Sequence, residues 1–350
     1  MCPGAHLILC LATIPVGWAL GRMGTAMPRA NPYAGRVSAL SREEFEQLQS
    51  AVAERRCREE YGFGTFAEAA AEYRPHPPCP SCGDGAPFKD GISDSGLQRY
   101  RCRSCGCRFN SLTGTVLERS KKDLPTWIGF IRLMCWNVPL DAIAELCGIS
   151  HQIAWEWRHR VFATVDGYQD GIVLRDRIWI DETYINDTDL THGYGEARKR
   201  GLSKQELCIA VAIDVHKNPV AVVCGHGKPS TKRMKNGLLS HMREGSVVVH
   251  DMEKAHKGLV KAAKCTDEAY KADVKDPVYL ECMAMVNNLC SWIKRYLWRF
   301  TGMDPANLQS YLNWYVYLFR VNQAQDKWPK TERVVRHLLM AKTQYRSSRA

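Results

Sequence analysis

The sequence RIWIDETYIN, residues 177–186, has the bulky and β-branched side chains of a buried strand, yet Asp181 and Glu182 lie at its centre. Burying a carboxylate without a partner costs several kcal/mol. A further acid, Asp251, ends the apolar run SVVVHD, residues 246–251. Two such carboxylates meeting across a sheet repel each other unless a divalent cation lies between them, and Mg²⁺ needs only a few side-chain oxygens. We therefore expect Asp181 and Asp251 to hold a metal ion; the alternative is that Asp181 only closes its strand with a hydrogen bond or salt bridge.

The residues around this stretch alternate between strand-like and helical patterns. The strand-like runs are 177–185, 207–215, 219–225 and 246–251, and the helical patterns are 229–243, 253–264, 283–300 and 306–325. A hairpin-like group of strands followed by a crossover helix and another strand favours an α/β fold with a mixed sheet flanked by helices. We place this domain at residues 176–325.

Two CxxC turns separated by 19 residues supply four thiols with metal-ligand spacing: Cys79, Cys82, Cys102 and Cys105. Each turn presents two thiolates, and the pair closes the tetrahedral site that zinc prefers. We predict a zinc ribbon over residues 79–111 in which Cys107 is a spare. Surface cysteines at this spacing by chance are the alternative.

Residues 139–162, PLDAIAELCGISHQIAWEWRHRVF, read as two helices joined by a tight turn at Gly148. In helix-turn-helix motifs the second helix enters a DNA groove. We place such a domain at residues 112–165, and an ordinary helical hairpin is the alternative. The side chains that we expect on the exposed, DNA-binding face of the second helix are His151, Gln152, Arg158 and His159.

The charge of the chain favours a polyanionic partner. It has 48 Lys and Arg against 37 Asp and Glu, a net charge of +11. Residues 99–160 alone have ten Lys and Arg against five Asp and Glu. A zinc ribbon followed by a basic helical hairpin is typical of a protein that reads double-stranded DNA, and phosphate contacts would dominate its affinity.

Cysteine usage and the first residues bear on the compartment. Many of the 15 cysteines lie in apolar runs or in the metal turns, which favours a reducing cytoplasm over a disulfide-forming one. Residues 7–20, LILCLATIPVGWAL, resemble the apolar part of a signal peptide, but no Lys or Arg precedes Arg22. The alternative is a start codon assigned upstream of Met27. No later segment is long and apolar enough to span a membrane, so we expect no membrane association.

Both ends of the chain carry extensions. Residues 41–62, SREEFEQLQSAVAERRCREEYG, predict an amphipathic helix capped by Ser41, with Glu44 completing a capping box. We therefore expect an N-terminal extension over residues 1–78 with one helix. Residues 326–350 are expected to form a basic tail.

The order of these features resembles a known family. A zinc ribbon, a helix-turn-helix, IDETY (180–184), GHGKPS (225–230), VVVHD (247–251) and VNNLCSWIKRYLWRFTGMDPANLQSYLNWYVYLF (286–319) are similar to the Merlin-related insertion-sequence transposases over about residues 79–320. The resemblance implies an RNase H-like catalytic domain of the DDE type that uses Mg²⁺ or Mn²⁺. It also implies DNA element ends and target DNA as substrates, a homodimer or higher oligomer on DNA, and a location at the bacterial nucleoid.

The resemblance also implies site residues. The family's first and second acids match Asp181 and Asp251, and its third position, on a helix, matches Asn287. Lys294, seven residues later, lies on the same helix face and would contact a phosphate near the scissile bond. Asparagine at the third position is similar to the Asp-Asp-Asn branch of the family, in which Asp181, Asp251 and Asn287 hold Mg²⁺. Glu182 matches the usual residue beside the first acid and takes a supporting role.

Further positions either extend this set or depart from the family pattern. Lys228, in GKPS, is a candidate for lining the DNA path, and Asn288 and Glu281 are rivals to Asn287. Relatives often read VNxxHSxLK around the third site residue and TDxHxAY around the second. This chain has Cys290 in the first pattern and HDMEKAH, residues 250–256, in place of the second.

Three functions fit these observations. The leading one is a transposase that binds terminal inverted repeats, nicks DNA and joins the freed 3′-hydroxyl to a target. The second is a sequence-specific DNA-binding regulator, including a catalytically decayed transposase, that does not cleave DNA. The third is a metal-dependent nuclease that cuts DNA and never joins it.

Overall fold

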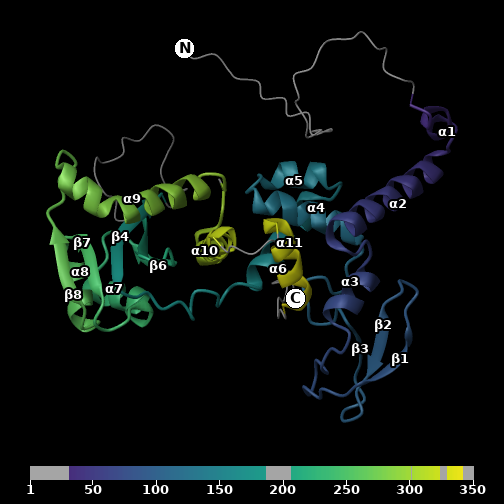
Figure 1. The fold of residues 1–350 in the computed structure, drawn as a ribbon, viewed down its shortest axis with the longest axis horizontal. Helices are drawn as coiled ribbons and strands as arrows, with labels where there is room; N and C mark the ends of the chain where they lie inside the picture. Colours follow the sequence, from purple (N-terminus) through teal and green to yellow (C-terminus); the bar gives the residue numbers. More distant parts are fainter. Residues whose placement is uncertain (1–30, 187–205, 301, 324–328, 342–350) are drawn as a thin grey trace, which may run out of the picture. The chain divides into compact units, whose positions relative to one another are not determined.

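Five strands form one mixed sheet in the order β6-β5-β4-β7-β8 in the computed structural model of the chain (Figure 1). The strands are Arg177–Ile185 (β4), Leu207–Asp214 (β5), Pro219–His226 (β6), Val247–Asp251 (β7) and Thr266–Tyr270 (β8). β4, β5 and β6 are antiparallel neighbours, and β7 and β8 run parallel to β4. Three antiparallel strands extended by two parallel ones, with helices on the faces, are consistent with an RNase H-like fold, so the predicted fold class is confirmed.

The structure describes residues 31–186, 206–300, 302–323 and 329–341. The chain divides into two units, Met1–Ala51 and Val52–Ala350. The apolar segment at residues 7–20 lies outside the described residues. No helix in the described ranges has both the length and the apolar composition that crossing a bilayer requires.

The apolar patterns placed four of the five strands correctly. All eight residues of β5, LCIAVAID, are buried, because β5 lies between β4 and β6 and both faces of the sheet are covered. The strand that the patterns missed is β8, TDEAY, in which no residue is fully buried. An edge strand needs little apolar surface, so β8 has no strand-like hydrophobic signal.

Helices cover both faces of the sheet. They are Thr231–Leu238 (α7), Lys254–Ala262 (α8), Pro277–Leu297 (α9) and Leu308–Gln323 (α10), with short 3₁₀ turns at Leu239–His241 (η1) and Pro305–Asn307 (η2). α9 lies on the face that carries Trp179, whose Nε1 donates to the backbone oxygen of Cys282 (2.8 Å). α7 lies on the other face, where Gly237 packs directly against Cys224 and Val222. The side chains of neighbouring β4 residues therefore point toward different helices.

The N-terminal part of the chain contains short elements. The helices are Ala34–Ser38 (α1), Arg42–Tyr61 (α2), Phe66–Tyr73 (α3), Leu124–Cys135 (α4), Leu140–Leu146 (α5) and His151–Ala163 (α6); the strands Phe88–Ile92 (β1), Gln98–Arg101 (β2) and Arg108–Asn110 (β3) form an antiparallel sheet. The Ser41–Glu44 capping box is present, with Glu44 Oε2 accepting from the Ser41 N–H (2.8 Å). Residues 31–78 thus hold three helices, where the sequence patterns predicted one.

α5 and α6 form the predicted pair of helices. Gly148 has a φ of +58°, which places the turn between them in the left-handed region that glycine adopts without strain. Ser150 caps α6 by accepting from the N–H of Ile153 (3.2 Å). Trp157 of α6 stacks on Trp127 of α4 with ring centroids 3.7 Å apart, so α4 completes a three-helix unit.

The C-terminal residues differ from the expected basic tail. Lys330–Met340 form a helix, α11, that buries Val334, Val335, Leu338 and Leu339. This apolar stripe at helical spacing packs into the main core, and the basic residues occupy other positions on the helix. The count of cations in this segment concealed the stripe. Residues 342–350 of the expected tail lie outside the described residues.

Candidate active site

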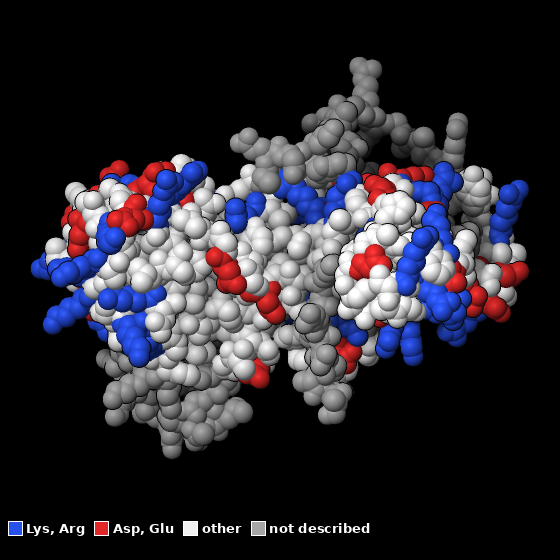
Figure 2. Space-filling model, turned by 90° about the horizontal axis from the view of Figure 1, so that it is seen from below, with Lys and Arg blue, Asp and Glu red and all other residues white. Residues whose placement is uncertain are grey.

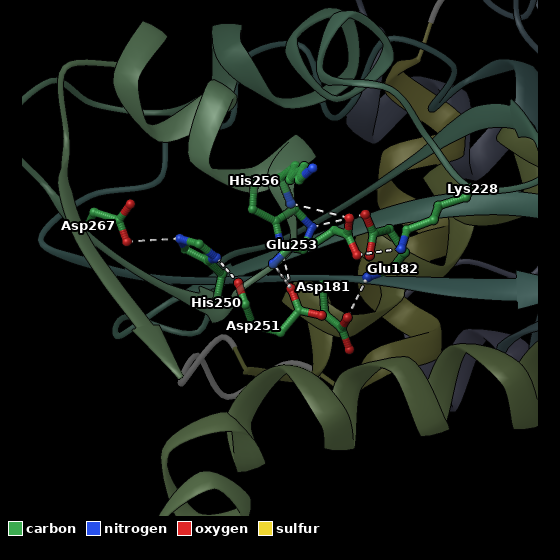
Figure 3. A network of polar contacts seen from close by, with 9 residues as sticks. Asp181, Glu182, Lys228, His250, Asp251, Glu253, His256 and Asp267 are labelled. Atoms are coloured by element: carbon green, nitrogen blue, oxygen red, sulfur yellow. Dashed lines mark hydrogen bonds and ion pairs between the residues drawn. The ribbon is translucent and has the colours of Figure 1, made fainter. Parts of the chain in front are cut away.

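Two neighbouring strands bring Asp181 and Asp251 together. β4 and β7 pair in parallel with Trp179 opposite Val249, and each acid lies two residues further along its strand. Because side chains alternate along a strand, both acids point to the same side as that pair. Figure 3 shows the two carboxylates side by side, and the negative charge of Asp251 raises the pKa of Asp181. The convergence expected from the sequence is present.

Asp181 is a buried acid whose charge is unfavourable. Burial, together with the negative charges of Glu182 and Asp251, raises the pKa of Asp181 from 3.8 to about 7. Its Oδ1 accepts from the backbone N–H of Glu182 (2.8 Å), which offsets only part of this effect. A cation at this position would therefore be strongly favoured, and a bound divalent ion is the simplest way to supply one.

An imidazole that the sequence did not assign to the site connects its acids. His256, in α8, is fully buried, and its Nε2 donates to Glu182 Oε1 (2.9 Å). Its Nδ1 lies 2.8 Å from Asp251 Oδ1. The contacts run from the face of β4 that carries Glu182 to the end of β7 (Figure 3). His256 therefore fixes the position of both carboxylates.

The charges of this group are tightly linked. Burial alone would lower the pKa of His256, but its contacts with Asp251 and Glu182 raise it to about 10. Burial alone would raise the pKa of Asp251, but His256 holds it below its ordinary value. Asp251 is thus ionised beside a buried cation, and Asp181, which has no such direct contact, keeps its raised pKa.

Glu253 and Lys228 lie at the edge of this group. The backbone N–H of Glu253 donates to Asp251 Oδ1 (3.2 Å), and Glu253 Oε2 forms an ion pair with Lys228 Nζ (2.5 Å). The Lys228 side chain remains 61% exposed. The predicted position of Lys228 beside the site, accessible to a phosphate, is consistent with these contacts.

α9 lies over the two acids. Burial and then the charges of Asp181 and Asp251 raise the pKa of Tyr279, and burial followed by the charge of Asp181 raises that of Cys290 well above its ordinary value. Asn287 lies one turn before Cys290; it is half-buried and, among the described residues, makes no side-chain hydrogen bond. Lys294 is exposed on the same helix. Tyr279 and Cys290 of α9 therefore lie close enough to the acids to be affected by their charge, whereas no contact joins Asn287 or Lys294 to either carboxylate within the described ranges.

The sequence treated Glu253 and His256 only as departures from the family pattern. The signal that identifies them is HDMEKAH itself: Glu253 caps the start of α8, and His256 lies in the first turn of that helix. A residue five positions after a strand acid can turn back toward it when a helix begins at once. The predicted helix over residues 253–264 already placed His256 in a first turn, so the missing information was that Glu182 lies beside it.

The four predicted zinc ligands form a compact group. Their sulfur atoms all lie within 4.8 Å of one another, with 3.6 Å between Cys79 and Cys105 and 3.5 Å between Cys82 and Cys102. Tetrahedral zinc with Zn–S bonds of about 2.3 Å requires sulfur atoms about 3.8 Å apart, so the group fits this ion. Cys107 does not belong to the group.

The exposed part of α6 is shorter than the sequence predicted. His151 and Gln152 are exposed at its start, but Arg158 and His159 are buried, at 5% and 8% exposure. Arg158 lies over the ring of Phe300 (5.1 Å), and burial followed by the charge of Arg158 lowers the pKa of His159 to about 4. The expectation that Arg158 and His159 lie on an exposed face is therefore wrong. The second half of α6 packs against other helices instead of facing solvent.

A cavity of about 960 Å³ adjoins the ribbon strands and the segment that leads into α4. Five cations line it, together with four acids; the cations are Arg99, Arg108, Arg119, Lys121 and Lys122. Arg108 pairs with Asp90 (3.3 Å) and Arg119 with Glu118 (3.7 Å), so part of this positive charge is already neutralised.

Comparisons with known proteins give only remote similarities. No protein-family model matches the chain, and no curated protein matches it. Among solved structures, a chain of the simian T-cell lymphotropic virus intasome in complex with the PP2A regulatory subunit B56 gamma is 11% identical, with a TM-score of 0.29 over 60% of this chain and 74% of that one. A chain of a pre-cleavage Mos1 transpososome is 9% identical, with a TM-score of 0.21 over 62% of this chain and 79% of that one. Scores this low assign no function to this chain.

Proposed function

We propose that the protein is a DNA transposase, related to the Merlin-type insertion-sequence enzymes, that cleaves and joins DNA strands with a divalent metal ion. The observation that carries this proposal is the pair of carboxylates, Asp181 and Asp251, held side by side at the centre of an RNase H-like sheet. Strongly shifted pKa values gather at functional sites, and the raised pKa of Asp181, about 7, supports a functional role for this acid.

Oxygen donors at this position fit Mg²⁺ or Mn²⁺, which keep several waters and need few protein ligands. A bound ion of this kind activates the attacking hydroxyl and stabilises the leaving oxygen of a phosphodiester. In our proposal Asp181 and Asp251 hold the ion, and the Glu182–His256 pair keeps Asp251 in place. Asn287 orients a water or ligates the ion, and the exposed Lys294 contacts a phosphate near the scissile bond.

The DNA contacts in this proposal come from several elements. His151 and Gln152 at the exposed start of α6 would reach base edges, as the first residues of a recognition helix do. The cations of the ribbon cavity and Lys228 would contact phosphates, which position the duplex without reading its sequence. The zinc ribbon, with Cys79, Cys82, Cys102 and Cys105 as ligands, would hold the cations of the ribbon cavity in place. Assembly on two DNA ends would require at least a dimer.

The test is a cleavage and joining assay with purified protein on labelled duplexes that carry the ends of the element. Wild type is compared with Asp181→Asn and Asp251→Asn, which preserve shape, in Mg²⁺ and in Mn²⁺. We expect cleavage and 3′-end joining by the wild type only, and equal DNA binding by all three proteins.

The outcomes separate the three functions. Binding by all proteins without cleavage by any of them would make the chain a DNA-binding regulator. Cleavage without joining would make it a nuclease. Equal cleavage by wild type and both variants would remove Asp181 and Asp251 from the chemistry and overturn the proposal.

A further inference from the structure

One nitrogen in the site forms a short ion pair whose geometry is not that of a hydrogen bond. His256 Nδ1 is buried and has no hydrogen-bond partner among the described residues, although it lies 2.8 Å from Asp251 Oδ1. A buried polar atom without a hydrogen bond is costly, and native proteins seldom retain one without a reason. Two neighbouring ligands of an octahedral ion with bonds of about 2.1 Å lie about 3 Å apart, which is close to the separation of His256 Nδ1 and Asp251 Oδ1.

The other nitrogen of the ring is held in the way expected of a metal ligand. His256 Nε2 donates to Glu182 Oε1 (2.9 Å), and both side chains are shielded, at 0% and 7% exposure. Metal-bound histidines almost always donate their second N–H to a carboxylate or carbonyl, which fixes the ring and leaves the ligating nitrogen without a proton. Glu182 holds His256 in this way, and a bound ion would take the place of the Nδ1 proton that faces Asp251 in the metal-free protein.

A second imidazole nearby is not held in this way. His250, Asp251 and His256 each offer one ligand atom, and these three atoms lie within 4.8 Å of one another, so either ring could be considered a ligand. Both nitrogens of His250 already have partners, however: Nδ1 contacts the backbone oxygen of Asp251, and Nε2 contacts Asp267 Oδ1 (3.1 Å). His250 is therefore a structural residue and a suitable control.

We propose that His256 Nδ1 is a ligand of the divalent ion bound at Asp251, and that the site consequently prefers Mn²⁺ to Mg²⁺. This inference rests on the proposed function for the existence of the metal site and adds a nitrogen ligand to it. An imidazole favours transition-metal ions, whereas Mg²⁺ binds oxygen donors almost exclusively. His256 contacts Asp251, whereas Asn287, the residue matched to the third position, makes no contact with either acid within the described ranges.

The test uses the full-length zinc-loaded protein with Mn²⁺ as the probe. Pulsed electron paramagnetic resonance of the bound Mn²⁺ detects a directly coordinated nitrogen, and growth on ¹⁵N-histidine changes that signal only if the nitrogen belongs to a histidine. We expect the histidine signal in wild type and in His250→Gln. In His256→Ala we expect loss of the signal and a fall in Mn²⁺ affinity of about 100-fold or more, since removal of an outer partner of a ligand alone costs about 10–100-fold.

The wild-type spectrum decides the question even if His256→Ala fails to fold. Bound Mn²⁺ without a nitrogen signal, or a signal that is lost in His250→Gln, would overturn the assignment of His256. A Mg²⁺ affinity equal to that for Mn²⁺ would overturn the metal preference. The proposed function is tested separately: it fails if Asp181→Asn still cleaves DNA, whatever the spectrum shows.

A different observation concerns the outer surface of α7 and α8. Neither helix contains an Asp or Glu, and together they carry five lysines that are at least partly exposed and have no ion pair among the described residues: Lys232, Lys235, Lys254, Lys257 and Lys261. The last three have the i, i+3, i+7 spacing of one helix face. On the face shown in Figure 2, Lys and Arg side chains gather at the left of the view, the side on which Figure 1 places these helices. We call these five residues the lysine face.

We infer that the lysine face binds the phosphate backbone of duplex DNA without reading its sequence. Compact ammonium groups that are not engaged with acids suit phosphate oxygens, and a row of them along a helix suits an extended polyanion. This inference rests on the proposed function only in choosing DNA as the polyanion. The lysine face lies on α7 and α8, whereas α9 covers the opposite face of the sheet.

The measurement is the salt dependence of binding to a random-sequence duplex by full-length Lys254→Ala/Lys257→Ala/Lys261→Ala protein. Each lost phosphate contact lowers the slope of log K against log salt concentration by about 0.9, so we expect a slope smaller by up to about 2.7. The matched control, with arginine at the same three positions, keeps the wild-type slope. An alanine variant that keeps the wild-type slope and affinity for duplex DNA would overturn the inference. Weaker binding to RNA or to an acidic peptide, with binding to duplex DNA unchanged, would also overturn it.

Discussion

The molecule contains two candidate metal centres that are built in opposite ways. The four cysteines of the ribbon come from two short turns and surround a closed tetrahedral position. The acidic centre takes its residues from β4, β7 and α8 and leaves positions for waters or substrate. Closed sites of this kind are structural, and open ones are catalytic. If both centres bind the ions that we propose, the first would stabilise its own surroundings, whereas the second gathers buried charge that a bound ion would offset.

Zinc removal should produce the largest effect. Structural zinc contributes about 10–16 kcal/mol to the folding of small domains, and the ribbon's own buried cluster consists of Cys79, Tyr100, Cys102 and Phe109. We therefore expect Cys102→Ser, or a strong chelator, to unfold residues 79–111 while the sheet domain stays folded. Hydrogen exchange with mass spectrometry measures this directly. Protection of β2 that persists without zinc would contradict the assignment of a structural site.

Removing a carboxylate should affect chemistry and leave folding intact. Asp251→Asn is expected to slow DNA cleavage by about 10³-fold or more, which corresponds to about 4 kcal/mol of transition-state stabilisation. Its binding to DNA should change little, because the substitution removes none of the cations or α6 side chains that contact DNA in our proposal. Single-turnover cleavage measured beside a binding titration checks both halves. A parallel loss of DNA binding would indicate that the acid serves structure.

The buried acid should make the metal-free protein less stable at neutral pH. The pKa of Asp181 in the folded protein, about 7, lies above its ordinary value of 3.8, so the folded state loses stability relative to the unfolded state as pH rises from about 4 to 7. Asp181→Asn should relieve this and stabilise the metal-free protein by about 1–4 kcal/mol at pH 8, with little gain at pH 4. Urea unfolding of both zinc-loaded proteins in buffer without Mg²⁺ or Mn²⁺ measures the difference. A variant less stable than wild type at pH 8 would show that Asp181 serves folding.

The smallest effect should come from the cysteine that lies beside the zinc ligands without belonging to them. Cys107 packs at the edge of the ribbon cluster, where its Sγ contacts the backbone oxygen of Arg108 (3.8 Å), and it lies outside the group of four ligand sulfur atoms. Cys107→Ser should change ribbon stability by no more than about 0.5 kcal/mol, as is usual for substitutions outside special interactions. Zinc content by atomic emission should stay the same. A lower zinc content would make Cys107 a ligand.

The sequence identified all the proposed ligands of the cysteine centre but missed His256 in the acidic centre, and the reason is physical. The spacing within each CxxC turn brings two thiols together, so the sequence pattern alone identifies the group Cys79, Cys82, Cys102 and Cys105. Asp181 and Asp251 stand out because each carboxylate interrupts an apolar strand. His256 gave no such signal, since a histidine in the first turn of a predicted helix is ordinary until Glu182 is known to lie beside it.

Burial was harder to predict than element type. Strands β4 to β7 follow from their apolar runs, but the polar edge strand β8 does not. Arg158 and His159 are charged or polar residues that tertiary packing encloses, and no local pattern distinguishes them from the exposed His151 and Gln152. The stripe of α11 was similarly concealed within a basic segment.

The most direct test of the account is a crystal of the protein soaked in Mn²⁺ and measured at the manganese absorption edge. We predict an anomalous peak between β4 and β7, about 2.1–2.2 Å from an oxygen of Asp181 and from one of Asp251. A well-ordered crystal with both carboxylates visible and no peak between them, or with Mn²⁺ bound to only one of the two, would contradict the claim that these acids share an ion.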